Sequence, residues 1–423
     1  MPSPRRLTPG ALERLLVELT ESHELIGPVE VEGEILFAPV TDPARLARDY
    51  VNSLVPPKEH LLPARERLLH YRVENGVPSL PATDEGGEIA PRVIFGIRSC
   101  DVAGIAYLER YFSGAMFDRP DTADRPFMRR RAATTLISVV CTRPGPTCMC
   151  VCCQGGPALD HGFDWQLTQL ADGWLVEIGS GRGERLATRF AHLLSDSVPG
   201  DLAARDAQVR ATVDHFGETT MHRVPTMAAT RMVSSGELGE SFWRIVGDRC
   251  FECGGCAFVC PTCWCFNVAD VRGCGEAMFD EPADVLRPVV GGDPSDPVRD
   301  GDWERVRLRD CCNLAGFIRQ AGGGYPRVTC GERCLTRFFH KLSQQFHERM
   351  GAPGCTGCGR CVQTCLGEEG IDAVAEGMRV VLTGPGRAST PPARILAGAT
   401  RPRAAGRHAG AESASRGSAE VTR

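Results

Sequence analysis

Cysteine spacing gives the clearest chemical signal in this sequence. Two stretches share the pattern C-x2-C-x2-C-x3-C, and their cysteines are Cys250, Cys253, Cys256 and Cys260 in the first run and Cys355, Cys358, Cys361 and Cys365 in the second run. Three thiolates within one tight turn can each reach a different iron of a cubane iron–sulfur cluster. Glycines between the cysteines leave room for backbone N–H groups beside the sulfides. We therefore predict that both runs bind [4Fe-4S] clusters.

The fourth cysteine of each run decides how the ligands are shared. In two-cluster ferredoxins, the last cysteine of each run binds the cluster of the other run. We therefore assign Cys250, Cys253, Cys256 and Cys365 to cluster 1, and Cys355, Cys358, Cys361 and Cys260 to cluster 2. The alternative is a pair of zinc sites, because C-x2-C pairs also bind zinc. Four closely spaced cysteines in each run favour iron–sulfur clusters over zinc.

Two further cysteines follow apolar stretches that are typical of buried strands. The stretches span residues 93–97 and 134–140, and Cys100 and Cys141 come shortly after them. Ligand sites in open α/β sheets gather at the carboxyl ends of the strands. Cys148 and Cys150 follow in a loop rich in glycine and proline, so we predict a cluster 3 held by Cys100, Cys141, Cys148 and Cys150. The alternative is that these are buried thiols without a ligand role.

The segment between the two runs supplies another candidate ligand set. Cys263 and Cys265 follow the first run directly, and Cys312 and His340 come later. Three cysteines and one histidine could hold a cluster 4, whereas a lone helical histidine more often packs in the core or faces solvent. No role is predicted for the remaining cysteines, which are Cys152, Cys153, Cys274, Cys311, Cys330 and Cys334.

These candidate ligands need a fold to position them. Apolar periodicity predicts helices over residues 11–21, 42–54, 102–111, 185–194 and 335–350, a helical region over 203–237, and a hairpin over 163–178. The fold class predicted is α+β. We expect a mixed α/β domain over residues 1–237 and a ferredoxin-like domain over residues 238–382 with an insertion at 266–350. Residues 383–423 lack periodicity and are predicted to be a disordered tail.

Composition excludes several classes of function. The net charge of -5 gives no basic surface for nucleic acid. No apolar run approaches the ~20 residues needed to cross a bilayer, and the N-terminal residues lack an apolar signal core. The 21 cysteines therefore fit a cytoplasmic protein whose thiols are kept reduced for metal. No cofactor site beyond the clusters is predicted, because the glycine-rich stretch at 179–183 lacks the spacing of a dinucleotide-binding loop.

The sequence also resembles a known family. The motifs F-G-I-R-S-C-D, C-G-G-C-A-F-V-C-P-T-C-W-C-F, A-G-G-G-Y-P-R and C-T-G-C-G-R-C are similar to those of the iron–sulfur beta subunit of cytoplasmic sulfhydrogenases, the NAD(P)-linked [NiFe]-hydrogenases. They are also similar to those of a close relative, the electron-transfer subunit of anaerobic sulfite reductase. Cys312 matches the cysteine of the family's Asp-Ser-Cys motif, where this chain has Asp310-Cys311-Cys312. Relatives carry histidine or cysteine at the position of His340.

The resemblance implies a role within a larger complex. The expected partners are a flavin subunit that handles NAD(P)H and the small and large subunits of a [NiFe]-hydrogenase, or a siroheme subunit in a sulfite reductase. We therefore predict a non-catalytic electron-transfer subunit that carries two to four [4Fe-4S] clusters. A zinc-binding structural scaffold is the alternative from another class.

Overall fold

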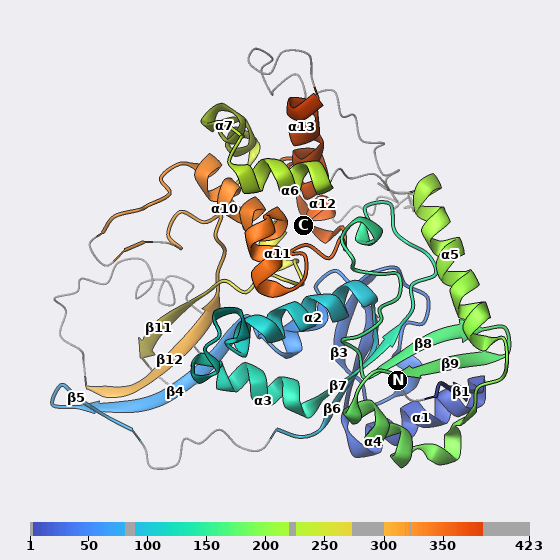
Figure 1. The fold of residues 1–423 in the computed structure, drawn as a ribbon. Coiled ribbons are helices and arrows are strands. Elements are labelled where there is room, and N and C mark those ends of the chain that lie inside the picture. Colours follow the sequence, from blue (N-terminus) through green and yellow to red (C-terminus); the bar gives the residue numbers. More distant parts are fainter. Residues whose placement is uncertain are drawn as a thin grey trace, which may run out of the picture.

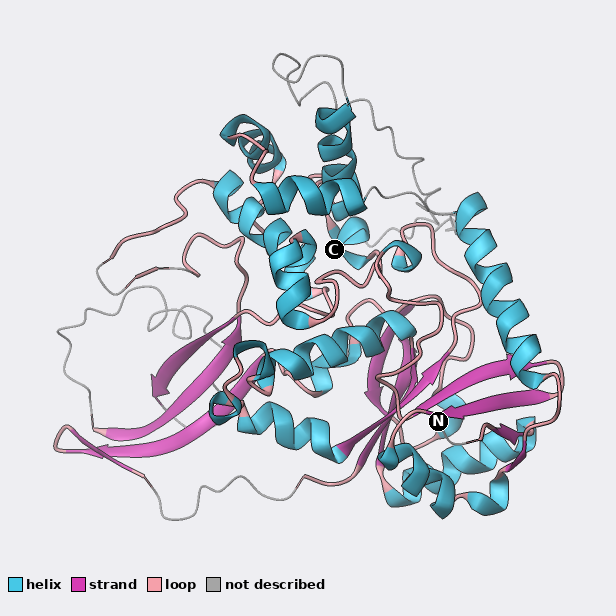
Figure 2. Ribbon diagram, viewed as in Figure 1, coloured by secondary structure: helices cyan, strands magenta, loops and turns pink. Residues whose placement is uncertain are grey.

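The structure of the chain is a computed structural model that describes residues 3–80, 89–219, 226–272, 300–317, 319–320 and 323–383. It contains both helices and sheets, which confirms the α+β class (Figures 1 and 2). No helix within these residues combines the length and apolarity needed to span a membrane. The predicted disordered tail lies outside the described residues apart from its first residue, Thr383.

Among the described residues, eight strands form the larger sheet, in the order β10-β1-β9-β8-β7-β6-β2-β3. The strands are β1 (Arg5–Leu7), β2 (Glu24–Val31), β3 (Glu34–Pro39), β6 (Arg92–Ile97), β7 (Thr134–Val139), β8 (Trp165–Leu170), β9 (Gly173–Ile178) and β10 (Ser195–Asp196). The central strands β2, β6, β7 and β8 are parallel, and antiparallel strands flank them on both sides. The parallel centre places the carboxyl ends of β6 and β7, where cluster 3 is predicted, at the same edge of the sheet.

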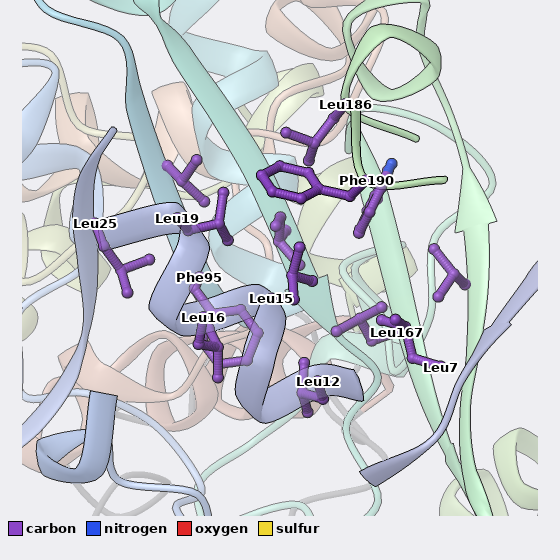
Figure 3. Close-up of a cluster of buried hydrophobic side chains, with 14 of the residues drawn as sticks. Leu7, Leu12, Leu15, Leu16, Leu19, Leu25, Phe95, Leu167, Leu186 and Phe190 are labelled. Atoms are coloured by element: carbon purple, nitrogen blue, oxygen red, sulfur yellow. The ribbon is translucent and has the colours of Figure 1, made fainter. Parts of the chain in front are cut away.

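Helix α1 (Pro9–Ser22) shows how sequence pattern fixes one side of this sheet. The hydroxyl of Thr8 caps the helix by accepting a hydrogen bond from the N–H of Ala11. Its leucines recur at helical spacing and are all buried, in agreement with the predicted helix over residues 11–21. Figure 3 shows Leu12, Leu15, Leu16 and Leu19 among apolar side chains from the sheet and from α4 (Gly181–Arg189).

Helix α2 (Ser99–Phe112) and helix α3 (Arg125–Ala133) surround a second apolar cluster. Because α2 begins directly after β6, it places Cys100 and Asp101 in its first turn, at the carboxyl end of that strand. Two aromatic rings of α2 contact Trp264, which lies just after the first run: Tyr111 stacks on it, and Tyr107 packs at a tilted angle. The N-terminal region is thus packed directly against the cysteine-rich region.

A smaller sheet joins segments that are distant in the sequence. In the described residues it has the order β11-β12-β4-β5, with strands β4 (Arg65–Glu74), β5 (Val77–Ser79), β11 (Phe266–Arg272) and β12 (Gly301–Arg309). Strand β4 belongs to the predicted N-terminal domain, whereas β12 belongs to the predicted insertion, and the two are antiparallel neighbours. The buried Arg307 pairs with Glu66 and Asp124 across this join. The domain limits at residues 237 and 238 stay a prediction.

The C-terminal region is mainly helical and has its own core. Its helices in the described residues are α6 (Thr226–Ser235), α7 (Glu240–Arg249), α8 (Gly255–Phe258), α10 (Cys330–Leu342), α11 (Gln344–Met350), α12 (Arg360–Thr364) and α13 (Ile371–Thr383). The preceding helix, α5 (Asp201–Thr219), instead contacts β8 and β9 of the larger sheet. Figure 1 shows α6, α7, α10 and α13 close together above α2. The short helices α8 and α12 each follow the second cysteine of a run, and they contact each other.

Two predicted helices are wrong or incomplete. Residues 42–54 form only a 3-10 turn over Pro43–Arg45 and then an irregular segment. Asn52 and Ser53 in that segment hydrogen-bond to Arg360, and these long-range contacts replace the helix. The predicted helix over 335–350 instead starts at Cys330, with a capping box from Thr329, and is interrupted at Ser343, whose hydroxyl caps α11.

Candidate metal centres

The two cysteine runs have the same local backbone. Glu252 and Gly254 of the first run have positive φ angles of 53° and 72°, and Gly357 and Gly359 at the equivalent positions of the second run have 67° and 78°. Left-handed residues at these points turn the chain sharply enough for successive cysteines to face one centre. The repeated geometry is what two cluster-binding loops of one type require.

The candidate ligands of cluster 1 lie together. Burial raises the pKa of Cys256, and the nearby thiolates of Cys365 and Cys250 raise it further. Cys365, the last cysteine of the second run, is therefore close to the first run. The backbone N–H of Glu369 donates a hydrogen bond to Cys365 Sγ, at 3.2 Å. Cys253 is the one exposed cysteine among those described.

The candidate ligands of cluster 2 show the reciprocal arrangement. Burial raises the pKa of Cys361 to about 12, and the thiolates of Cys355 and Cys260 contribute to this increase. Burial also raises the pKa of Cys358, and Cys260 acts in the same direction. The backbone N–H of Gly357 donates to Cys355 Sγ at 3.4 Å. The last cysteine of the first run thus lies among the first three cysteines of the second run.

The four candidate ligands of cluster 3 also converge. Burial raises the pKa of Cys148 to about 11, and the nearby Cys141 thiolate also raises it. The N–H of Gly145 donates to Cys148 Sγ and acts in the opposite direction. The pKa of Cys150 is raised by burial and then by Cys148 and Cys141. Cys100 completes the group, because burial, Asp101 and the neighbouring thiols, Cys150 among them, raise its pKa.

The cluster 3 loop rests directly on the second run. The N–H of Met149 donates to the carbonyl of Gly357 at 2.8 Å, and Cys148 Sγ lies 3.9 Å from the carbonyl oxygen of Cys358. A Cβ atom on Gly357 would come within 2.5 Å of the backbone of Cys150. Glycine at this position therefore permits the close approach as well as the positive φ angle.

The four candidate ligands of cluster 4 line one pocket. Cys263, Cys265, Cys312 and His340 all contribute to it, together with Trp264, Arg337 and Lys341. The thiols of Cys265 and Cys311 hydrogen-bond Cys312 and lower its pKa well below the ordinary value. Burial lowers the pKa of His340 to about 4. Its imidazole is therefore neutral at pH 7, which is the form that ligates metals.

His340 is held in place by aromatic side chains. Its ring centroid lies 5.6 Å from that of Trp264, with the planes 27° apart, and 4.5 Å from that of Phe346. The half-buried imidazole thus packs against aromatic rings, and it lines the same pocket as the three thiols. Packing and a ligand role are compatible here.

Buried cations surround the thiols, at positions that no sequence pattern predicts. Lys58 Nζ donates to the carbonyl oxygens of Cys260 and Cys263, the latter at 2.8 Å. Lys341 Nζ donates to Thr262 Oγ1 at 2.6 Å, and the thiolates of Cys260 and Cys263 raise the pKa of this lysine against the effect of burial. Positive charge at these positions offsets the charge of several thiolates in a low-dielectric interior.

Several cysteines without a predicted role lie beside candidate ligands. The thiol of Cys153 hydrogen-bonds Cys355 and lowers its pKa. Cys311 contacts Cys312, and Cys330 and Cys334 lie beside Cys250. Cys274 is outside the described residues. None of the twenty described cysteines forms a disulfide. Reduced, converging thiols at four points fit iron–sulfur ligation.

Comparisons with known proteins agree with this chemistry. The family described as a 4Fe-4S dicluster domain matches residues 293–368, a range that contains the whole second run. Over 368 residues the chain is 26% identical to the beta subunit of sulfhydrogenase 2 from Pyrococcus furiosus, and the alignment covers 85% of this chain and 95% of that protein. The chain is related to iron–sulfur hydrogenase beta subunits. The match to a 4Fe-4S dicluster domain and the many cysteines support [4Fe-4S] clusters as cofactors of this chain.

Proposed function

We propose that the chain carries electrons through four [4Fe-4S] clusters in a cytoplasmic [NiFe]-hydrogenase, and that it links the small and large subunits of that enzyme to a flavin subunit that handles NAD(P)H. The assignment to a hydrogenase is supported by the similarity to a sulfhydrogenase beta subunit. Each cubane accepts and releases one electron, with a potential tuned by burial and by hydrogen bonds to sulfur. The contribution of this chain is to hold the clusters close together in a fixed order.

The main support for this proposal is that the ligands of the four candidate clusters lie next to one another. Cys100 of cluster 3 is close enough to Cys358 of cluster 2 for the Cys358 thiolate to contribute to the raised pKa of Cys100. Cys260 of cluster 2 hydrogen-bonds Cys263 of cluster 4. The pKa of Cys361, also of cluster 2, is raised in part by Cys256 of cluster 1. Cluster 2 thus occupies the centre of the proposed relay, and the other three adjoin it.

The exposed thiol of Cys253 marks one end of the relay. Every other described cysteine is buried or half-buried. Cluster 1 is therefore the candidate cluster that has a solvent-exposed ligand. The exposed side chains of Phe251 and Leu366 flank the two runs at the cluster 1 ligands Cys250 and Cys365. We propose that a partner subunit docks here and exchanges electrons with cluster 1.

Purification of the native complex tests the function. We expect the chain to co-purify with flavin and nickel, and the complex to evolve hydrogen from NADPH. Sulfite reduction without hydrogen evolution would instead assign the chain to an anaerobic siroheme sulfite reductase. A colourless chain with stoichiometric zinc would support the structural scaffold and contradict electron transfer.

A variant within the relay separates electron transfer from assembly. Cys358→Ser removes one predicted ligand of the central cluster. We expect the complex to remain assembled but to lose NADPH-driven hydrogen evolution, while hydrogen evolution from a small-molecule reductant that reaches the catalytic subunits directly is retained. Loss of both activities in an assembled complex would contradict a relay role for cluster 2.

A further inference from the structure

Three thiols meet where helices α7 and α10 cross. The Sγ atoms of Cys250, Cys330 and Cys334 all lie within 4.8 Å of one another, and those of Cys330 and Cys334 are 4.0 Å apart. Cys330 and Cys334 are four residues apart on α10, so their side chains lie on the same face of the helix. Cys334 is buried, whereas Cys330 and Cys250 are half-buried. We call these three residues the thiol triad.

Close helix packing creates the thiol triad. A Cβ atom on Gly247 of α7 would lie 2.5 Å from the backbone nitrogen of Gly331 of α10, and one on Gly331 would lie 2.5 Å from the carbonyl oxygen of Trp243. The two glycines therefore let the helix backbones touch. Because Cys250 directly follows α7 and Cys330 begins α10, this contact brings their thiols together.

Arg333 holds the surrounding loops against α10. Its buried guanidinium donates to Glu252 Oε2 at 2.7 Å and to the carbonyl oxygen of Asn313 at 3.1 Å. Glu252 lies two residues after Cys250, so the first of these bonds fixes the loop that carries one thiol of the triad. The side-chain amide of Asn313 lies 3.7 Å from Cys334 Sγ. The triad is thus a preorganised feature of the fold rather than a chance contact of mobile side chains.

The spacing of the sulfurs fits one metal ion. Thiolates bound to tetrahedral zinc at about 2.3 Å are about 3.8 Å from each other, close to the 4.0 Å between Cys330 and Cys334. The thiolates of a cubane bind different irons and are held apart by the cluster. Soft thiolate sets select zinc and similar ions over hard cations such as magnesium.

We propose that Cys250, Cys330 and Cys334 bind one zinc ion, with water as the fourth ligand, and that this ion competes with cluster 1 for Cys250. The competition rests on the proposed function, which gives Cys250 to cluster 1. Zinc bound between Cys330 and Cys334 would draw the Cys250 thiolate to itself, so we expect zinc at the triad to prevent the assembly of cluster 1. The availability of zinc would then control whether cluster 1, at the solvent-exposed end of the relay, is assembled.

Anaerobic reconstitution of the full chain tests the competition. The reduced chain is loaded with iron and sulfide in the absence or presence of one equivalent of zinc, and bound iron and zinc are then measured per chain. We expect about one zinc to bind and about four irons, the content of one cubane, to be lost from the zinc-treated sample. Cobalt(II) in place of zinc should give the intense thiolate-to-metal absorption of a three-sulfur site.

Variants separate the triad from other thiols. Cys330→Ser changes a half-buried residue at the first position of α10, so the helix interior stays intact. This variant should bind no zinc at the triad and should keep its full iron content when zinc is present. Cys152→Ser is the control, because Cys152 is also half-buried and has no predicted ligand role, and it should behave as the wild type.

Three results would overturn the proposal: no zinc uptake by the wild type, zinc uptake without loss of iron, or equal uptake by the wild type and Cys330→Ser. The iron content of the zinc-free samples keeps this test apart from the proposed function. Full iron content without zinc uptake rejects only the triad site. Absence of iron from the wild-type chain without zinc rejects the electron-transfer function.

Discussion

The buried ion pair between Arg360 and Asp101 offers a direct test of how the cluster-binding regions are joined. Arg360 lies in the second run between Cys358 and Cys361, and Asp101 follows Cys100 in α2. Their side chains are only 2% and 1% exposed, and the guanidinium donates to both carboxylate oxygens at 2.6 and 2.8 Å. Asp101→Asn removes the negative charge with little change in shape.

The expected cost follows from these contacts. Each hydrogen bond between charged groups contributes about 1.5–3 kcal/mol, and breaking a buried pair from one side typically costs about 3–5 kcal/mol because the remaining charge is uncompensated. Asp101→Asn should therefore destabilise the chain by about 3–5 kcal/mol. Arg360 keeps its hydrogen bonds to Ser53, so complete loss of folding is not expected. Arg360→Met in the Asp101→Asn background should recover part of the loss, because no unpaired charge is then left in the interior.

Urea unfolding of the iron-loaded chain under anaerobic conditions measures the effect. At a slope of about 3 kcal/mol per molar, Asp101→Asn should lower the unfolding midpoint by about 1 M or more. The control is Asp121→Asn, which breaks the exposed pair with Arg119 and should leave the midpoint unchanged. Equal midpoints for Asp101→Asn and the wild type, or a double variant less stable than Asp101→Asn, would refute the reasoning.

Further predictions concern individual metal centres. Cys148→Ala should lower the iron content by about four per chain, since it removes one ligand of cluster 3; chemical analysis of iron gives the count. His340→Ala should abolish the paramagnetic signal of one reduced cluster, whereas His340→Cys should retain it because a thiolate replaces the imidazole as ligand. Gly357→Ala should reduce the iron bound by clusters 2 and 3, because its Cβ atom would meet the backbone of Cys150. Gly323→Ala, at a similar positive φ angle of 80° but with open space around it, should cost only backbone strain of about 1–2 kcal/mol and keep its iron.

Each of these predictions has a contradicting outcome. Unchanged iron in Cys148→Ala would leave the cysteines of the cluster 3 loop as buried thiols. Retention of every cluster signal in His340→Ala would make His340 a packing residue. Iron loss in Gly323→Ala equal to that in Gly357→Ala would attribute the effect to strain rather than to the contact between the two loops.

Local sequence pattern was sufficient for the features that depend on neighbouring residues. The two runs were predictable because cluster ligation needs a fixed short spacing, and their equivalent positive φ angles follow from the same requirement. Helix α1 was predictable from its leucine periodicity and the capping residue Thr8. The strands before Cys100 and Cys141 were predictable because central parallel strands are apolar on both faces.

Features that depend on distant residues were not predictable from such patterns. The segment 42–54 has helical periodicity, but Asn52 and Ser53 are used instead as partners of Arg360, more than three hundred residues away. Lys58 is buried against carbonyl groups of the first run, a placement that no local pattern indicates. The proximity of Cys250 to Cys330 and Cys334 likewise depends on the glycine contact between α7 and α10.

Iron and acid-labile sulfide per chain, measured on the anaerobically purified protein, test the central claim most directly. Four cubanes predict about sixteen irons and an equal amount of sulfide, in a brown protein that dithionite bleaches. A chain that contains neither iron nor sulfide, or that carries only zinc at the two cysteine runs, would contradict the account.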